Sequence, residues 1–227
     1  MSEWQRVELH THTWASPDSR LSLETIIRVN QERGIDALAV TDHNTMDGAF
    51  ELAARAPFTV ILGEEIKSTE GDIIGLFLSE PIPRDMSPAE TVAAIKDQGG
   101  LVLVPHPCDR FRRSALGQEA TDSIVSDIDI VEVFNGRTLR HRDNDWADAY
   151  ARSHGCVRSV GSDSHLAVEI GRCWQLVRPW DGPDDFLEAL RHAELHAELA
   201  PAWVHLGSSI HASLAKADKR IRNLVQR

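Results

Sequence analysis

The sequence predicts an α/β fold, an irregular barrel of roughly seven parallel strands interleaved with helices. Short apolar runs alternate along the chain with amphipathic stretches, as in successive βα units. Four groups of histidines and carboxylates each directly follow an apolar run, where a barrel of this type carries its reactive residues. The 227 residues, 42% of them hydrophobic, suffice for one such domain with a sizeable core.

Eight apolar runs are expected to form strands, and cap residues mark the helices between them. Ser22 can cap a helix that Gly34 ends, and Ser87-Pro88-Ala89-Glu90 is a capping box with proline in the first turn. The expected strands are Arg6–Leu9, Ala37–Val40, Thr59–Leu62, Ile73–Leu78, Leu101–Val104, Ile128–Phe134, Val157–Val160 and Cys173–Val177. The expected helices are Leu23–Arg33, Ala49–Arg55, one from Ser87 to Gly99, one from about Arg142 to His154, Asp184–His192 and a basic one over Ser208–Arg227.

Bulk composition narrows the class of protein. The net charge of −11 argues against general electrostatic binding of long nucleic acid or an anionic membrane. Three cysteines without CxxC spacing, Cys108, Cys156 and Cys173, fit a reducing compartment. The first residues have no apolar signal segment, and no apolar run approaches the ~18 residues of a membrane span. We therefore expect a cytoplasmic protein, with its oligomeric state left open.

Two pairs of candidate ligands share one spacing. His10 and His12 are two residues apart on an extended segment, so both imidazoles point to one face and can chelate one ion. Asp163 and His165 repeat the spacing after Val157–Val160, with one oxygen ligand. Each pair alone can also be interpreted as exposed polar residues or as a capping turn.

Other candidates follow the remaining strands. They are His43 with Asp42 as its outer support, His106 between two prolines, the acidic pair Glu64 and Glu65, one of which can bridge two ions, and Asp18 in the loop after the first pair. Each has a plainer interpretation as a turn residue, a structural histidine or a solvated acidic pair. Together, histidines and carboxylates at successive strand ends predict a divalent-metal site. The other six histidines, His141, His154, His192, His196, His205 and His211, are interpreted as structural or surface residues.

The order of these motifs resembles the PHP (polymerase and histidinol phosphatase) superfamily. That order is HxH, then TDH, then a Gly-x-Glu strand end, then a strand followed by Pro-His, then Gly-Ser-Asp-x-His. The resemblance covers about residues 6–178, and the Ser16-Pro17-Asp18-Ser19 segment is similar to that of small stand-alone metal-dependent phosphoesterases. It implies a distorted (βα)7 TIM-like barrel, one PHP domain over residues 1–227, with a helical segment of about 180–227 packed on the motif-bearing core.

The resemblance also implies two or three divalent ions, manganese, zinc or iron, in one cleft. His10, His12, Glu65 and Asp163 would hold the first ion, Glu65 would bridge to a second ion shared with His106, and Asp18, His43 and His165 would hold a third. The chain departs from the family pattern in two places. Asn135 stands nearest to where many members carry a further histidine, and Asp72 stands where some relatives have histidine. The second ion is therefore the least secure.

We expect hydrolysis of a phosphoester bond in a small phosphorylated or nucleotide-like substrate. A metal-bound hydroxide would attack, so no side-chain nucleophile is needed. Arginines would bind the phosphate. The candidates are Arg110, Arg112 and Arg113, just past His106, and Arg137, with Lys67 as a weaker one. Three alternatives stay open: an exonuclease acting on short oligonucleotides, a hydrolase of an amide bond, and a metal-stabilised module without activity.

Overall fold

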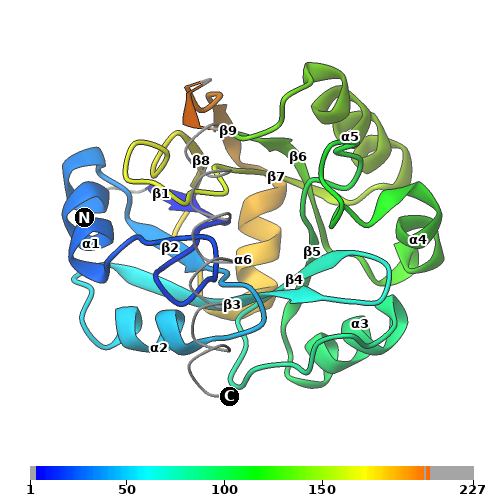
Figure 1. Ribbon diagram of the computed structural model, residues 1–227, viewed down its shortest axis with the longest axis horizontal. Coiled ribbons are helices and arrows are strands. Elements are labelled where there is room, and N and C mark those ends of the chain that lie inside the picture. Colours follow the sequence, from blue (N-terminus) through cyan, green and yellow to red (C-terminus); the bar gives the residue numbers. More distant parts are fainter. Residues whose placement is uncertain (1–3, 202, 205–227) are drawn as a thin grey trace, which may run out of the picture.

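The computed structural model describes residues 4–201, 203 and 204. Nine strands of this part form one sheet in the order β7-β6-β5-β4-β3-β2-β1-β8-β9, which curls into a nearly closed barrel (Figure 1). The strands are β1 (Gln5–Glu8), β2 (Ala37–Val40), β3 (Thr59–Lys67), β4 (Asp72–Leu76), β5 (Leu101–Val104), β6 (Ile130–Asn135), β7 (Val157–Gly161), β8 (Cys173–Val177) and β9 (Glu194–Ala197). The helices are α1 (Leu23–Arg33), α2 (Asp47–Ala53), α3 (Pro88–Asp97), α4 (Gly117–Ser123), α5 (His141–His154) and α6 (Gly182–Arg191). The predicted α/β barrel is confirmed.

The strand directions differ from the prediction. Strands β1, β2 and β3 pair in parallel, and so do β5, β6 and β7. Strand β4 is antiparallel to both β3 and β5, and β8 is antiparallel to both β1 and β9. The expectation of parallel strands throughout is therefore wrong for β4 and β8. Residues 68–71 join β3 to β4, and a segment this short allows a hairpin but not the crossover that a parallel pair needs.

Several element boundaries also differ from those expected. Strand β3 continues to Lys67, so Glu64 and Glu65 lie within the strand rather than after it. Helix α4 and strand β9 have no counterpart among the expected elements. Both predicted caps are confirmed: the side chains of Ser22 and Ser87 accept from backbone N–H groups of α1 and α3. The basic helix expected over Ser208–Arg227 lies outside the described residues, and the assignment of residues 1–227 to one domain stays a prediction.

The interior of the barrel is filled by side chains from the strands and from α6. Phe186, Ala189 and Leu190 of α6 pack against the first residues of several strands, among them Ala37 and Leu101. Helix α6 therefore closes the amino end of the barrel, and it lies at the centre of the view in Figure 1 with α1 to α5 around the outside. The carboxyl end is left for polar side chains. No helix of the described residues is long and apolar enough to cross a bilayer.

One amide side chain bridges the seam of the barrel, between β7 and β1. Gln175 of β8 is fully buried. Its Oε1 accepts from Val160 N at 2.6 Å, and its Nε2 donates to Val7 O and Val160 O at 3.0 Å each. Further toward the carboxyl end, the backbones following β1 and β7 pair directly, with His12 N donating to Ser164 O at 3.0 Å. Hydrogen bonds thus join β7 to β1 across the seam.

The substitution Gln175→Leu should lower the free energy of unfolding by about 3 kcal/mol, because it leaves the Val160 N–H and two carbonyls unpaired in the seam. Urea denaturation measures the change. The control is Gln118→Leu, at an exposed position of α4. A Gln175→Leu protein as stable as the control would show that this amide does not hold the seam.

Candidate metal centre

Five histidines and three carboxylates from several strands converge at the carboxyl rim. His10 and His12 follow β1, His43 follows β2, His106 follows β5, and Asp163 and His165 follow β7. Glu65 points inward from β3, whereas its neighbour Glu64, on the other face, accepts from Ile82 N at 2.8 Å. The described residues contain four groups of three donors able to hold a metal ion: His12, His43 and His165; His10, His12 and Asp163; His10, Glu65 and His106; and His43, Glu65 and Asp72.

The innermost group has the spacing of a metal site. His12 Nε2 lies 3.2 Å from His10 Nε2, 3.3 Å from Glu65 Oε2 and 3.3 Å from Asp163 Oδ1. His10 Nε2 lies 3.4 Å from Glu65 Oε2 and 3.7 Å from Asp163 Oδ1. Ligand atoms at the usual zinc distance of about 2.0–2.1 Å form tetrahedral edges of roughly 3.3 Å. These four side chains therefore have the spacing of donors around one ion.

Two further donor groups share Glu65 or adjoin it. His106 Nε2 lies 3.2 Å from Glu65 Oε1, so the two oxygens of this carboxylate face different imidazoles. His43 Nδ1 lies 3.2 Å from Glu65 Oε2. Asp18 Oδ2 lies 3.5 Å from His43 Nε2 and 3.2 Å from His165 Nε2. The loop carrying Asp18 thus brings a carboxylate back to the rim.

Buried ligand atoms without hydrogen-bond partners show that the residues suit a metal. Glu65 Oε2, Asp163 Oδ1 and His165 Nε2 are buried in the described structure, and none of them has a hydrogen bond. Leaving such groups unpaired is costly, and native proteins pair them or bind metals with them. The donor set of imidazoles and carboxylates fits Zn, Mn or Fe.

Glu132 of β6 contacts two candidate ligands, and the sequence analysis does not identify it. Its Oε1 lies 2.9 Å from His10 Nδ1, and its Oε2 accepts from His106 N at 2.8 Å. If His10 carries its proton on Nδ1, the proton is donated to Glu132 and the Nε2 lone pair faces the centre. Gly161 makes room for this pair, because a Cβ there would lie 2.0 Å from Glu132 Oε1. A lone glutamate in the apolar run Ile130–Phe134 is the sequence signal.

The amide of Asn135 lies between the carboxylates of Glu132 and Asp163. Its Nδ2 donates to Glu132 Oε2 at 2.9 Å and to Asp163 Oδ2 at 3.3 Å. Its Oδ1 accepts from Arg137 N at 2.9 Å. The amide therefore links two carboxylates at the place where the family resemblance suggests a histidine.

Asp42 supports a different segment from the one expected. Its Oδ1 accepts from Thr13 N and its Oδ2 from Thr13 Oγ1, both at 2.6 Å. The expected support of His43 by Asp42 is thus corrected, because both oxygens face the turn after the HxH motif. Ser16 Oγ instead accepts from His43 N at 2.9 Å and lies 2.9 Å from His12 Nδ1. Ser16 joins the first two histidine motifs.

The charges of the cluster depend on one another. Burial acts to raise the pKa of Glu65, but His43 and His10 hold it well below its ordinary value. Burial likewise acts to raise the pKa of Asp163, and Arg112 and His10 keep it well below its ordinary value. Burial acts to lower the pKa of His43, yet Glu65 and Asp18 raise it to about 10. Without metal, therefore, protonated imidazoles balance the buried carboxylates.

His165 differs from the other imidazoles. Burial, His12 and Arg137 together lower the pKa of His165 to about 4, so the ring is neutral near pH 7. Its Nδ1 lies 2.8 Å from Asp163 O and 2.6 Å from Arg137 Nη1, and only one of these contacts can be a hydrogen bond at a time. A proton on Nδ1 pairs with the carbonyl and leaves Nε2 free to bind a metal.

Two candidate ligands have left-handed backbone conformations. The φ angles are 30° at His106 and 53° at Asp163. Residues with a Cβ rarely adopt this region, at a cost of about 1–3 kcal/mol, and such strain is found at functional sites. Here the strained backbone aims both side chains at the centre.

The arginines expected to bind substrate are divided between different positions. Arg112 reaches the cluster, with Nη1 paired to Asp163 Oδ2 and Nη2 3.5 Å from Asn135 Oδ1. Arg110 and Arg113 on either side are exposed. Arg137 is buried, with Nε 3.1 Å from Glu169 Oε1. Sequence alone does not distinguish Arg112 from its neighbours, because loop geometry decides which one points inward.

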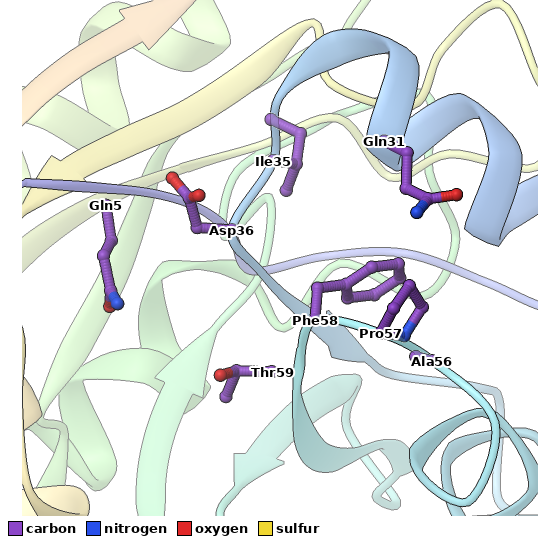
Figure 2. Close-up of a pocket in the computed structure, with 8 residues that line it drawn as sticks. All are labelled: Gln5, Gln31, Ile35, Asp36, Ala56, Pro57, Phe58 and Thr59. Carbon is purple, nitrogen blue, oxygen red and sulfur yellow. The ribbon is translucent and has the colours of Figure 1, made fainter. Parts of the chain in front are cut away.

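A wide groove of about 670 Å³ lies at the opposite end of the strands (Figure 2). Its lining includes Gln5, Asp36 and Thr59, at the start of β1, just before β2 and at the start of β3. The only charged side chain of the lining is Asp36, whose Oδ2 accepts from Arg6 N at 2.9 Å. Without imidazoles or clustered carboxylates, this groove has none of the metal-binding donors of the rim.

Fold and cluster together define a class, the barrel-shaped metal-dependent hydrolases whose ligands come from strand ends. Residues 8–103 match the PHP domain model, and residues 141–195 match the PHP-associated model. The uncharacterized protein MJ1587 of Methanocaldococcus jannaschii is 42% identical over 61% of this chain and 84% of its own length. MJ0417 of the same organism, also uncharacterized, is 30% identical over 82% of this chain and 79% of its own length. The chain belongs to the PHP family.

Solved structures share the fold at low identity. A two-domain protein from Bacteroides vulgatus containing a PHP-like metal-dependent phosphoesterase superposes with a TM-score of 0.66 and 19% identity, over 86% of this chain and 65% of that protein. PsfC from Pseudomonas syringae also gives a TM-score of 0.66, at 17% identity over 93% of this chain and 99% of PsfC. An amidohydrolase from Chromobacterium violaceum gives 0.58, at 18% identity over 89% of this chain and 96% of that protein.

Glu132→Gln should weaken zinc binding roughly 10- to 100-fold, because His10 loses the charged partner that orients it. Competition with a chromogenic chelator measures the affinity. Glu119→Gln, at an exposed position of α4, is the matched control. Equal affinities for the two variants would exclude the orienting role.

The metal-free protein should lose stability as the pH rises from 6.5 to about 10. The pKa of His43 is raised to about 10 in the folded state, so its stabilisation is complete below pH 6.5 and disappears as the proton leaves. Urea denaturation in chelator across this range measures the effect, and His43→Gln should flatten the curve. Added manganese or zinc should oppose the loss, because metals bind the deprotonated rings. A chelated protein equally stable at both ends would contradict this account.

Proposed function

We propose that this protein hydrolyses a phosphoester bond of a small phosphorylated substrate at the carboxyl-rim cluster. The observation that carries the proposal is the juxtaposition of unpartnered ligand atoms with a guanidinium. Glu65 Oε2 and Asp163 Oδ1 converge with the imidazoles, and Arg112 is paired with the other oxygen of Asp163. A phosphoryl group needs cations on several oxygens, and a metal cluster bordered by arginine provides them.

The proposed ligands are His10, His12, Asp18, His43, Glu65, His106, Asp163 and His165, with Asp72 as a further candidate beside His43 and Glu65. Two or three divalent ions held there would supply Lewis acidity and a water of lowered pKa. The protein's own contribution is orientation. Glu132 fixes the ring of His10, Ser16 lies against His12, and Arg137 and Glu169 form the wall behind His165.

Arg112 is the strongest candidate to bind the phosphate. Its side chain is 23% exposed, so Arg112 borders solvent while its guanidinium contacts Asp163. A planar fork of N–H donors can exchange one carboxylate contact for a bidentate contact to phosphate. Arg110, Arg113 and Arg137 remain proposed substrate contacts, with Arg137 limited by its position behind His165.

The free thiols of Cys108, Cys156 and Cys173 support a reducing, cytoplasmic location.

Amide hydrolysis is the principal competing chemistry, since the rim donors suit either bond type. Exonuclease action on short oligonucleotides uses the same donors and differs only in substrate. The net charge of −11 disfavours long nucleic acid as a partner. A substrate panel separates these possibilities.

The manganese-loaded full chain should release nitrophenol from p-nitrophenyl phosphate, and chelator should abolish the activity. His10→Ala and Asp163→Ala should reduce turnover to background, because each removes a donor of the innermost group. His154→Ala, at the exposed end of α5, is the control. Parallel assays with bis(p-nitrophenyl) phosphate, a short oligonucleotide and amino-acid p-nitroanilides test the other bond types. Cleavage of the anilides alone would overturn the proposal.

A further inference from the structure

A second cationic site lies beside the cluster. Arg110 from the loop after β5 and Arg140 and Arg142 from the start of α5 line one cavity of about 170 Å³. Cys108, Asp143 and Trp146 complete its lining, so three cations face one carboxylate. A water molecule occupies about 30 Å³ in the liquid, so the cavity has room for a phosphate or carboxylate group. This concentration of positive charge contrasts with the chain's net charge of −11.

The three arginines are not used for structural ion pairs. Ten arginines of the described structure pair with carboxylates, and Arg110, Arg140 and Arg142 are among the seven that form no ion pair within it. Arg140 is instead held over the ring of Phe111, with its guanidinium carbon 4.8 Å from the ring centroid. The contact with Phe111 thus positions Arg140 without using its N–H donors in an ion pair within the described residues.

The start of α5 adds to the positive potential. Arg140 is the N-cap of this 14-residue helix and makes no side-chain cap hydrogen bond. The first-turn N–H groups of a helix attract anions. Asp143 in the same turn partly offsets this charge, and its Oδ2 has no hydrogen-bond partner. An anionic group with a neighbouring hydroxyl donor would satisfy both the arginines and this oxygen.

The cavity adjoins the candidate metal centre through two short connections. Cys108 is two residues from His106, which limits their separation to roughly 7 Å along the chain. Asn144, next to Asp143, accepts from Asn135 N at 3.1 Å, and Asn135 donates to Asp163 at 3.3 Å. The residues that line the cavity are therefore close neighbours of the candidate metal ligands His106 and Asp163.

We infer that the cavity between Cys108 and the start of α5 binds a second anionic group of the substrate. The inference rests on the proposed phosphoesterase function and narrows its substrate class. The substrate carries one phosphoester at the rim and another phosphate or a carboxylate that Arg140 and Arg142 recognise. Phe111, next to Arg110, and Leu139, next to Arg140, are 58% and 57% exposed and provide apolar surface on the segments that carry these two arginines.

Matched substrate pairs test the inference. Fructose 1,6-bisphosphate is compared with fructose 6-phosphate, and 3-phosphoglycerate with glycerol 3-phosphate, on the manganese-loaded full chain. The second anion should raise kcat/KM, and Arg140→Gln/Arg142→Gln should reduce that preference by roughly tenfold or more. Arg28→Gln/Arg191→Gln makes the same charge change on exposed helical positions and should preserve it. A preference in the first pair alone identifies a phosphate site, and one in both pairs identifies a general anion site.

A binding measurement separates this inference from the proposed function. Calorimetric titration of chelator-treated protein with inorganic pyrophosphate should show binding that is at least roughly tenfold weaker in Arg140→Gln/Arg142→Gln than in the control double variant. Such binding without hydrolysis of any ester would overturn the proposed function but retain the anion site. Hydrolysis with equal substrate preference and equal pyrophosphate binding in both variants would overturn the anion site alone.

Discussion

Glu65 presents its two carboxylate oxygens to imidazoles that follow three other strands. His10, His12 and His43 face Oε2, and His106 faces Oε1. A buried carboxylate without counter-charge is strongly unfavourable, so this residue requires the ends of β1, β2 and β5 to meet around it. Strand β3 extends beyond its neighbours to place the residue there. The arrangement of the rim follows from compensating this one charge, with protons on imidazoles or with metal ions.

The same requirement accounts for the closed barrel. Asp163 reaches Glu65 and the histidines only because the backbone after β7 pairs with that after β1, where Asp163 N donates to His10 O at 2.9 Å. Gln175 joins the strands below this point, and α6 fills the opposite end. An apolar interior therefore supports a polar rim, and the backbones of His43, His106, Asp163 and His165 are each held there by a hydrogen bond.

Much of the fold and of the candidate cluster is predictable from sequence because strand ends are marked by apolar runs. His10, His12, His43, His106, Asp163 and His165 all follow such runs and do meet. What sequence does not provide is direction and partner choice. The hairpin of β3 and β4 reverses a strand expected to be parallel, Asp42 faces Thr13 instead of His43, and Arg112 points inward while Arg110 and Arg113 do not. Glu132 lies inside the apolar run of β6, and its partners His10 and His106 come near it only in the folded barrel.

The seam also sets an order for biosynthesis. Val7 is linked to Gln175 across 168 residues and Glu8 to Gly171 across 163, so β1 waits for β8 to be made. At the usual rate of ~5–20 residues per second, roughly 10–35 s pass before β8 is translated. During that interval the HxH motif has neither Asp163 nor His165 beside it. The complete set of donors exists only once Asp163 and His165 have been made, so all four donors of the innermost group can hold one ion only after that point.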